Sequence, residues 1–185
     1  MNHRSCSLAL GLALGSLLCG GSSFAADAET GTLDPQLEPF RPLLGRTWKG
    51  EFKNSTPDKP VVDIARWERA LNGKAIRLLH SINNGSYGGE TLFTWDAAKK
   101  SVVYHYFTTA GFMTVGTLTI QDGKWVTVEK VSGGSGGVTE VRGTSELRKD
   151  GTFHVSTEYV DATGKKSPGR EVTYRESPQA EVVFR

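Results

Sequence analysis

Short turn motifs recur at nearly regular intervals along most of this 185-residue chain, and they restrict its fold more than any other feature. Asn72-Gly73, Asn84-Gly85, Asp122-Gly123 and Asp150-Gly151 are pairs that readily adopt the positive φ of tight hairpins. The runs between such turns are rich in Val, Ile, Thr, Tyr, Phe and Trp, as expected of strands. This spacing predicts successive antiparallel strands joined by hairpins.

The number of runs predicts ten strands, near residues 47–53, 61–70, 74–83, 87–95, 100–108, 112–121, 124–131, 138–148, 152–160 and 169–176. A long meander in one sheet must close on itself or leave exposed edges, and closure removes the edges. We therefore expect an all-β fold, an antiparallel up-and-down barrel of about ten strands.

The stretch DPQLEPFRPLL, residues 34–44, is the one plausible helix. Asp34 can cap it, and Pro35 suits the first helical position. Pro39 and Pro42 keep it short and partly 3₁₀. Its apolar residues at helical spacing are Leu37, Phe40 and Leu44.

The first 25 residues have the pattern of a signal peptide. Arg4 supplies a positive start, residues 8–18 form an apolar run too short to span a bilayer, and Ser23-Phe24-Ala25 offers a cleavage site after Ala25. A lipoprotein would instead use Cys19, but Leu18 stands before it where a small residue is preferred. We expect export to the periplasm or medium.

Four segments follow from these observations: a signal peptide at 1–25, a flexible N-terminus at 26–33, the barrel at 34–176, and a tail or extra strand at 177–185. Cleavage would remove both cysteines, so the mature chain would have no disulfide and no cysteine metal site. Its net charge would be about +1, without the electrostatic signature of a nucleic-acid-binding protein. No second apolar run is long enough for a membrane helix.

The sequence LLGRTWKGEF, residues 43–52, precedes the meander, which closes on GREVTYRE, residues 169–176. With the short helix before it, residues 34–176 resemble the calycin-like barrels, and most closely a little-characterised lipocalin-like family of bacterial secreted domains. Lipocalins usually have Gly-x-Trp here, whereas Gly45 and Trp48 are separated by two residues. That difference favours the ten-stranded relatives over true lipocalins.

The resemblance implies structural roles for two residues. Trp48 would close the floor of the barrel, and an arginine of the last strand would stack on its ring, adding about 0.5–2 kcal/mol. Arg175 takes this role if the last strand is 169–176, and Arg185 takes it if AEVVFR closes the barrel instead. Pro178 interrupts the chain before that final run, which favours Arg175.

Candidate ligand-binding residues come from the aromatic and histidine positions. Tyr104 and Tyr106 share one face of a strand, and His105 and Phe107 share the other, so either pair could line a cavity. The full set of candidates is His80, Tyr104, His105, Tyr106, Trp125 and His154. The histidines lack metal-ligand spacing, so we predict no metal site.

No catalytic residue is assigned. GGSGG, residues 133–137, matches the Gly-x-Ser-x-Gly pattern of a nucleophile elbow, but a strand follows it where that motif needs a helix. We interpret it as a flexible hairpin loop. Glu90, Glu129, Glu158 and Glu171 lie centrally in strands, and charged residues there are expected to face solvent.

The sequence thus predicts an exported lipocalin-like barrel that binds a small apolar or amphipathic molecule. Two alternatives stay open. One is an enzyme that uses His or Tyr with a carboxylate in the same cavity. The other is a haem-binding barrel with a single axial histidine, for which His154 is the candidate. The identity of the ligand and the oligomeric state are open as well.

Overall fold

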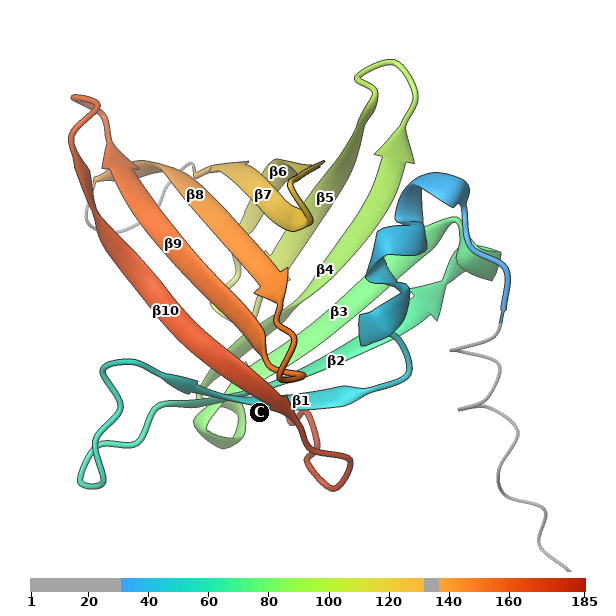
Figure 1. Ribbon diagram of the computed structural model, residues 1–185. Coiled ribbons are helices and arrows are strands. Elements are labelled where there is room, and N and C mark those ends of the chain that lie inside the picture. Colours follow the sequence, from blue (N-terminus) through green and yellow to red (C-terminus); the bar gives the residue numbers. More distant parts are fainter. Residues whose placement is uncertain (1–30, 132–136) are drawn as a thin grey trace, which may run out of the picture.

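The computed structural model describes residues 31–131 and 137–185, and within them ten antiparallel strands close into a barrel (Figure 1). Each strand pairs with its neighbours in sequence, and β1 also pairs with β10. The strands are β1 (Thr47–Phe52), β2 (Val62–Ala70), β3 (Ala75–Ile82), β4 (Tyr87–Asp96), β5 (Ser101–Thr108), β6 (Met113–Gln121), β7 (Lys124–Lys130), β8 (Val138–Leu147), β9 (Phe153–Asp161) and β10 (Lys166–Glu176). The predicted fold class is confirmed.

The predicted strand boundaries agree with the structure at nearly every turn. Asn72 and Asn84 adopt φ values of 54° and 57° in the short turns η2 (Leu71–Gly73) and η3 (Asn83–Gly85), as Asn-Gly pairs permit. The exception is β10, which begins at Lys166 rather than at residue 169. The pairing of β10 with β9 shifts register between Pro168 and Glu171. Proline has no backbone N–H to donate to the ladder, and a bulge is a position where that hydrogen bond is not needed.

The short helix η1 (Pro35–Leu43) is a 3₁₀ helix that covers one end of the barrel, which we call the closed end (Figure 1). The Asp34 carboxylate accepts a hydrogen bond from the Gln36 backbone N–H at 3.1 Å, which confirms the predicted cap. Leu37, Phe40 and Leu43 are fully buried beneath it. The helix thus plugs the barrel with apolar side chains.

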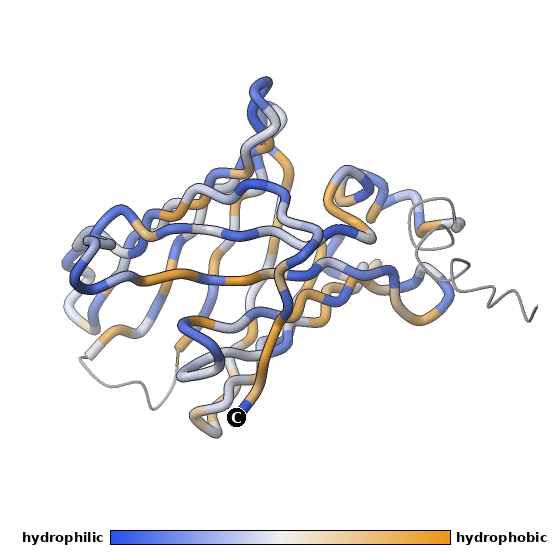
Figure 2. Tube along the Cα trace, turned by 90° about the horizontal axis from the view of Figure 1, so that it is seen from below, coloured by the Kyte–Doolittle hydropathy of each residue, from blue (hydrophilic) through white to orange (hydrophobic). Residues whose placement is uncertain are grey.

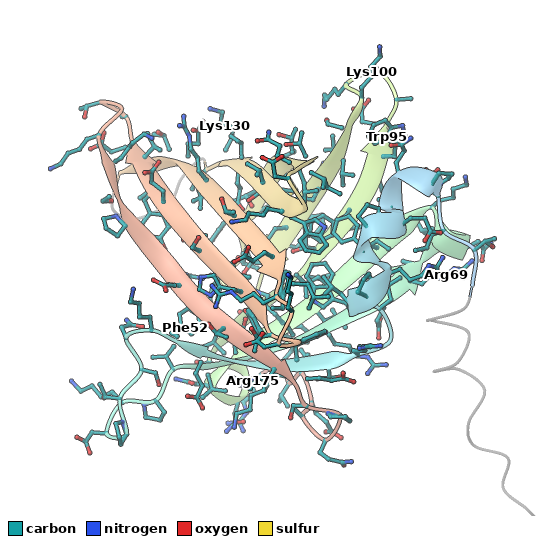
Figure 3. The ribbon with its side chains drawn as sticks, in the orientation of Figure 1. Phe52, Arg69, Trp95, Lys100, Lys130 and Arg175 are labelled. Carbon is teal, nitrogen blue, oxygen red and sulfur yellow. The ribbon has the colours of Figure 1, made fainter. Side chains whose placement is uncertain are left out.

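Trp48 is buried at the closed end, with 2% of its surface exposed, as predicted. Its indole N–H donates to the Leu43 carbonyl at 3.4 Å, and its ring centroid lies 6.3 Å from that of Phe153. The predicted stacking of Arg175 is wrong. Arg175 is exposed, and it pairs in register with Lys49 on the outer side of the barrel, where β10 passes β1 (Figure 3). Because side chains alternate along a strand, Trp48 and Arg175 face opposite sides.

Hydrophobic and hydrophilic residues alternate along several strands (Figure 2), with the inner face the more apolar. Two inward positions are glycines that lie under tyrosine rings. A Cβ at Gly50 would lie 2.5 Å from the Tyr174 ring, and a Cβ at Gly116 would lie 2.2 Å from the Tyr104 ring. Both tyrosines therefore lie flat against a neighbouring strand, which leaves space in the barrel interior.

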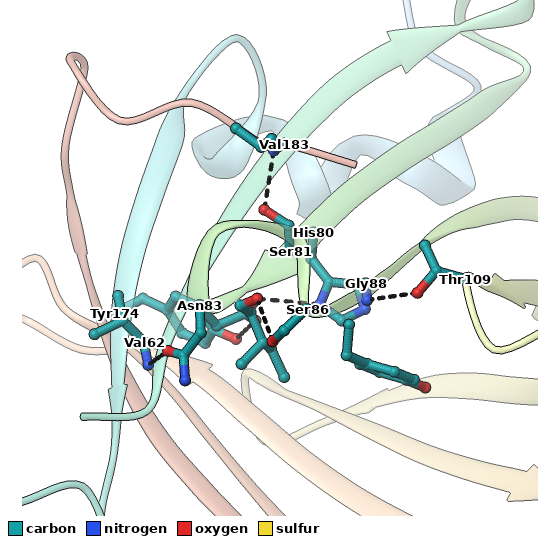
Figure 4. Close-up of polar contacts among 12 residues, drawn as sticks. Val62, His80, Ser81, Asn83, Ser86, Gly88, Thr109, Tyr174 and Val183 are labelled. Carbon is teal, nitrogen blue, oxygen red and sulfur yellow. Dashed lines mark hydrogen bonds and ion pairs between the residues drawn. The ribbon is translucent and has the colours of Figure 1, made fainter. Parts of the chain in front are cut away.

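After β10 the chain continues as a tail, residues 177–185, with no strand among them in the structure. The Val183 backbone N–H donates to the Ser81 hydroxyl at 3.0 Å on the outer side of β3 (Figure 4). Nearby, the Gly88 backbone N–H donates to the Thr109 hydroxyl at 3.1 Å. The closing strand is thus β10, and the run that ends in Arg185 packs outside the barrel.

Candidate functional site

A cavity of about 260 Å³ lies inside the barrel, and its wall nearest η1 is aromatic. The Phe40 ring centroid lies 5.9, 5.3 and 6.3 Å from those of Trp67, Phe93 and Trp125, and Phe153 lies edge-on to both tryptophans. These five rings form an apolar floor. Ligand pockets usually have volumes of about 300–1,000 Å³, and this cavity lies just below that range. It therefore suits a small ligand.

A chain of polar side chains crosses the other part of the cavity. The Tyr174 hydroxyl donates to Asp63 Oδ2 at 2.6 Å, and Asp63 Oδ1 lies 3.1 Å from His80 Nδ1. His80 Nε2 lies 2.8 Å from the Tyr106 hydroxyl, which lies 3.0 Å from the Tyr87 hydroxyl. We call these five residues the polar chain. Five different strands contribute to it, so only the closed barrel assembles it.

The buried carboxylate of Asp63 organises the polar chain, because it receives both Tyr174 and His80. A carboxylate accepts only, so His80 Nδ1 must carry the proton of this hydrogen bond. With Nδ1 protonated in a neutral ring, Nε2 accepts from the Tyr106 hydroxyl. Burial raises the pKa of both the Tyr106 and the Tyr174 hydroxyl, so both stay protonated as donors.

A second carboxylate faces the cavity beside a tyrosine. The Tyr104 hydroxyl donates to Glu129 Oε2 at 3.3 Å. Burial raises the pKa of both the Glu129 carboxyl and the Tyr104 hydroxyl above their ordinary values. The expectation that Glu129 faces solvent is therefore wrong. Its position follows from its alternation with Trp125 and Thr127, both of which also line the cavity.

The other three central glutamates lie on the outer face in ion pairs. Glu90 pairs with Arg77 at 3.0 Å, Glu158 with Lys166 at 3.0 Å and Glu171 with Lys53 at 2.7 Å. These carboxylates do not line the cavity. They leave Asp63 and Glu129 as the acidic side chains that do, among the residues the structure describes.

The candidate binding residues divide between the two sides of the barrel wall. His80, Tyr104, Tyr106 and Trp125 line the cavity. His105 is exposed on the outer face, and the His154 Nδ1 lies 3.1 Å from the Thr173 hydroxyl on that same side. Of the three histidines in the described parts of the chain, His80 alone faces the interior, and both its ring nitrogens are hydrogen-bonded.

The polar residues near the cavity that sequence reasoning missed include Asp63, Tyr87, Arg170 and Tyr174. A signal for Asp63 was present, because it alternates with Ala65 and Trp67 on one face of an otherwise apolar run. Tyr174 likewise alternates with Val172. Their mutual contacts could not be inferred, since Tyr174 and Asp63 are 111 positions apart.

Over residues 31–131 and 137–185, no three His, Cys, Asp or Glu side chains gather as a metal site, and no helix is long and apolar enough to cross a membrane. The signal-peptide pattern and most of GGSGG, residues 133–136, lie outside these ranges.

The chain matches no protein-family model, and a search of curated proteins finds no match either. The cavity is therefore the feature of the described chain that bears most directly on function.

Proposed function

We propose that this protein is an exported, lipocalin-like barrel that binds a small apolar or amphipathic molecule in its interior. The observation that carries the proposal is the internal cavity of about 260 Å³, aromatic at the closed end and polar elsewhere. The pattern of residues 1–25 supports export to the periplasm or medium. The closed antiparallel meander supports the lipocalin-like relationship.

The two parts of the cavity suit different parts of an amphipathic ligand. The rings of Phe40, Trp67 and Trp125 offer apolar surface, and contact with it stabilises a ligand by about 25 cal/mol per Å² removed from water. Tyr106 and Glu129 offer hydrogen-bonding groups that fix its orientation. Both parts are preformed, because tight side-chain contacts hold them in place.

Native mass spectrometry of the purified protein tests the proposal, together with fluorescence titration with N-phenyl-1-naphthylamine, an uncharged apolar probe. Thr91 is buried and lines the cavity, so Thr91→Phe should fill the interior and lower probe affinity at least about tenfold. Thr119→Phe places the same ring on an exposed position of β6 and is the matched control. Equal affinities for both variants, with no copurified molecule, would contradict the proposal.

Acid–base catalysis is a second candidate function, and the polar chain is the observation that favours it. Asp63 orients His80, whose Nε2 is the candidate general base, and the protonated Tyr106 hydroxyl beside it is the candidate donor to a molecule bound in the cavity. Tyr106→Phe should then abolish conversion of the molecule identified by mass spectrometry while retaining its binding. His105→Phe, on the exposed face of the same strand, should change neither.

A further inference from the structure

The bulge in β10 fixes the position of an arginine at the mouth of the cavity. Pro168 pairs with Glu158 and Glu171 pairs with Ser156, so Gly169 and Arg170 both lie opposite Thr157. The Arg170 backbone N–H donates to the Thr157 hydroxyl at 2.6 Å, and that hydroxyl donates back to the Arg170 carbonyl at 3.2 Å. Bulges of this kind often occur beside functional sites, where they position a side chain.

A glycine is required beside Arg170 for this arrangement. A Cβ at Gly169 would lie 2.3 Å from the Thr157 hydroxyl oxygen and 2.9 Å from its carbonyl oxygen. Arg170 alternates with Val172 and Tyr174, which face inward, and all three line the cavity. The Arg170 guanidinium lies 5.9 Å from the centroid of the Tyr87 ring, at the exposed rim.

The guanidinium of Arg170 has no ion pair or side-chain hydrogen bond with any part of the chain that the structure describes. Its neighbour Glu171 faces outward and pairs with Lys53, and Glu158 pairs with Lys166. Among the inward acidic groups, Asp63 already accepts from Tyr174 and His80. Glu129 is held by Tyr104 in a buried site that disfavours its charged form.

Arg170 therefore has no ion-pair partner among the described residues, and its charge acts on the Glu129 carboxyl in the largely apolar cavity only through space. The carboxylate of Asp63, in the polar chain, is hydrogen-bonded to Tyr174 and His80 and forms no ion pair with Arg170. A guanidinium offers five N–H donors in a planar fork that matches the two oxygens of a carboxylate. A ligand with one anionic group would complete the pairing at the rim while its apolar part reaches the aromatic floor.

We propose that the ligand of this barrel is a small apolar acid whose single anionic group, such as a carboxylate, pairs with Arg170 while its hydrocarbon part contacts the floor around Phe40. This inference depends on the proposed binding function and adds the chemical class of the ligand. It also assigns the β10 bulge a role, since the bulge and Gly169 hold the arginine at the rim.

Three probes with one apolar part and different head groups test the inference: 4-phenylbutanoate, 4-phenylbutanol and 4-phenylbutylamine. Titration calorimetry at neutral pH measures the affinity of each. We expect the acid to bind at least about tenfold more tightly than the alcohol, and the amine to bind most weakly. Quenching of the cavity-lining Trp67 and Trp125 gives an independent readout that the probe is inside.

Arg170→Gln should lower the affinity for the acid about tenfold and leave that for the alcohol unchanged. Arg170→Lys should retain part of the preference, because it keeps the charge but loses the fork. Arg175→Gln is the control, since Arg175 lies on the outer face of the same strand. Circular dichroism and urea midpoints confirm that each variant is folded.

The outcomes separate the two proposals. If the acid and the alcohol bind equally, or if Arg170→Gln and Arg175→Gln have equal effects, the anionic ligand class is wrong and cavity binding stands. If none of the three probes binds, and neither N-phenyl-1-naphthylamine nor any copurified molecule is detected, the binding function fails as well. A preference for the acid that Arg170→Gln abolishes supports both.

Discussion

Replacement of Phe40 by alanine should destabilise the protein more than any other single change in η1. Phe40 is fully buried, and its ring contacts those of Trp67, Phe93 and Trp125. Truncating a fully buried phenylalanine costs about 3–5 kcal/mol of unfolding free energy, including the cavity that it leaves. Phe40→Leu keeps most of the volume and should cost about 1.5 kcal/mol or less.

Urea denaturation followed by tryptophan emission measures this change, because two of the contacted rings are tryptophans. A domain of this kind has about 5–15 kcal/mol of stability, so Phe40→Ala should still fold. Its denaturation midpoint should fall while the slope stays the same, which indicates a change in stability alone. Phe107→Ala is the control, since Phe107 is 49% exposed on the outer face and should change stability by less than about 0.5 kcal/mol.

A loss below about 1 kcal/mol for Phe40→Ala, or a loss equal to that for Phe107→Ala, would refute the reasoning. Such a result would mean that η1 docks loosely and that the closed end of the barrel can open. The cavity would then have two accessible ends, and the aromatic floor would not be the preformed surface on which the proposed function depends.

Three further predictions concern buried charge, backbone conformation and aromatic packing. Burial raises the pKa of Glu129 above its ordinary 4.5, so the folded state loses stability as the pH rises above 4.5. Glu129→Gln removes this ionisation. It should therefore raise the urea midpoint at about pH 8 and have little effect at about pH 4. Gly73→Ala should cost more than Gly123→Ala in thermal melts, because both have positive φ but only a Cβ at Gly73 would meet backbone, at 1.9 Å. In a double-mutant cycle from denaturant melts, Trp48→Ala and Phe153→Ala should couple by about 0.5–1.5 kcal/mol, and strict additivity would contradict their ring contact.

The sequence alone determined the fold class because its signals are local. A turn such as Asn72-Gly73 readily adopts positive φ, and each β-branched or aromatic run between turns favours an extended strand. The cap at Asp34 and the burial of Trp48 also followed from nearby residues. Ten such strands in succession leave closure as the way to remove exposed edges.

The site needed the tertiary structure because closure sets which residues face each other across the barrel. One residue of register moves a side chain from one face to the other, so Arg175 was assigned to Trp48 although it points outward. Glu129 was expected in solvent because charged residues on strands usually face outward, whereas its alternation with Trp125 and Thr127 places it on the inner face of β7. The pairing of Asp63 with Tyr174 joins β2 to β10, and no local pattern links strands that far apart in the chain. The position of Arg170 likewise depends on how β10 meets β9 at the bulge, which composition and spacing do not specify.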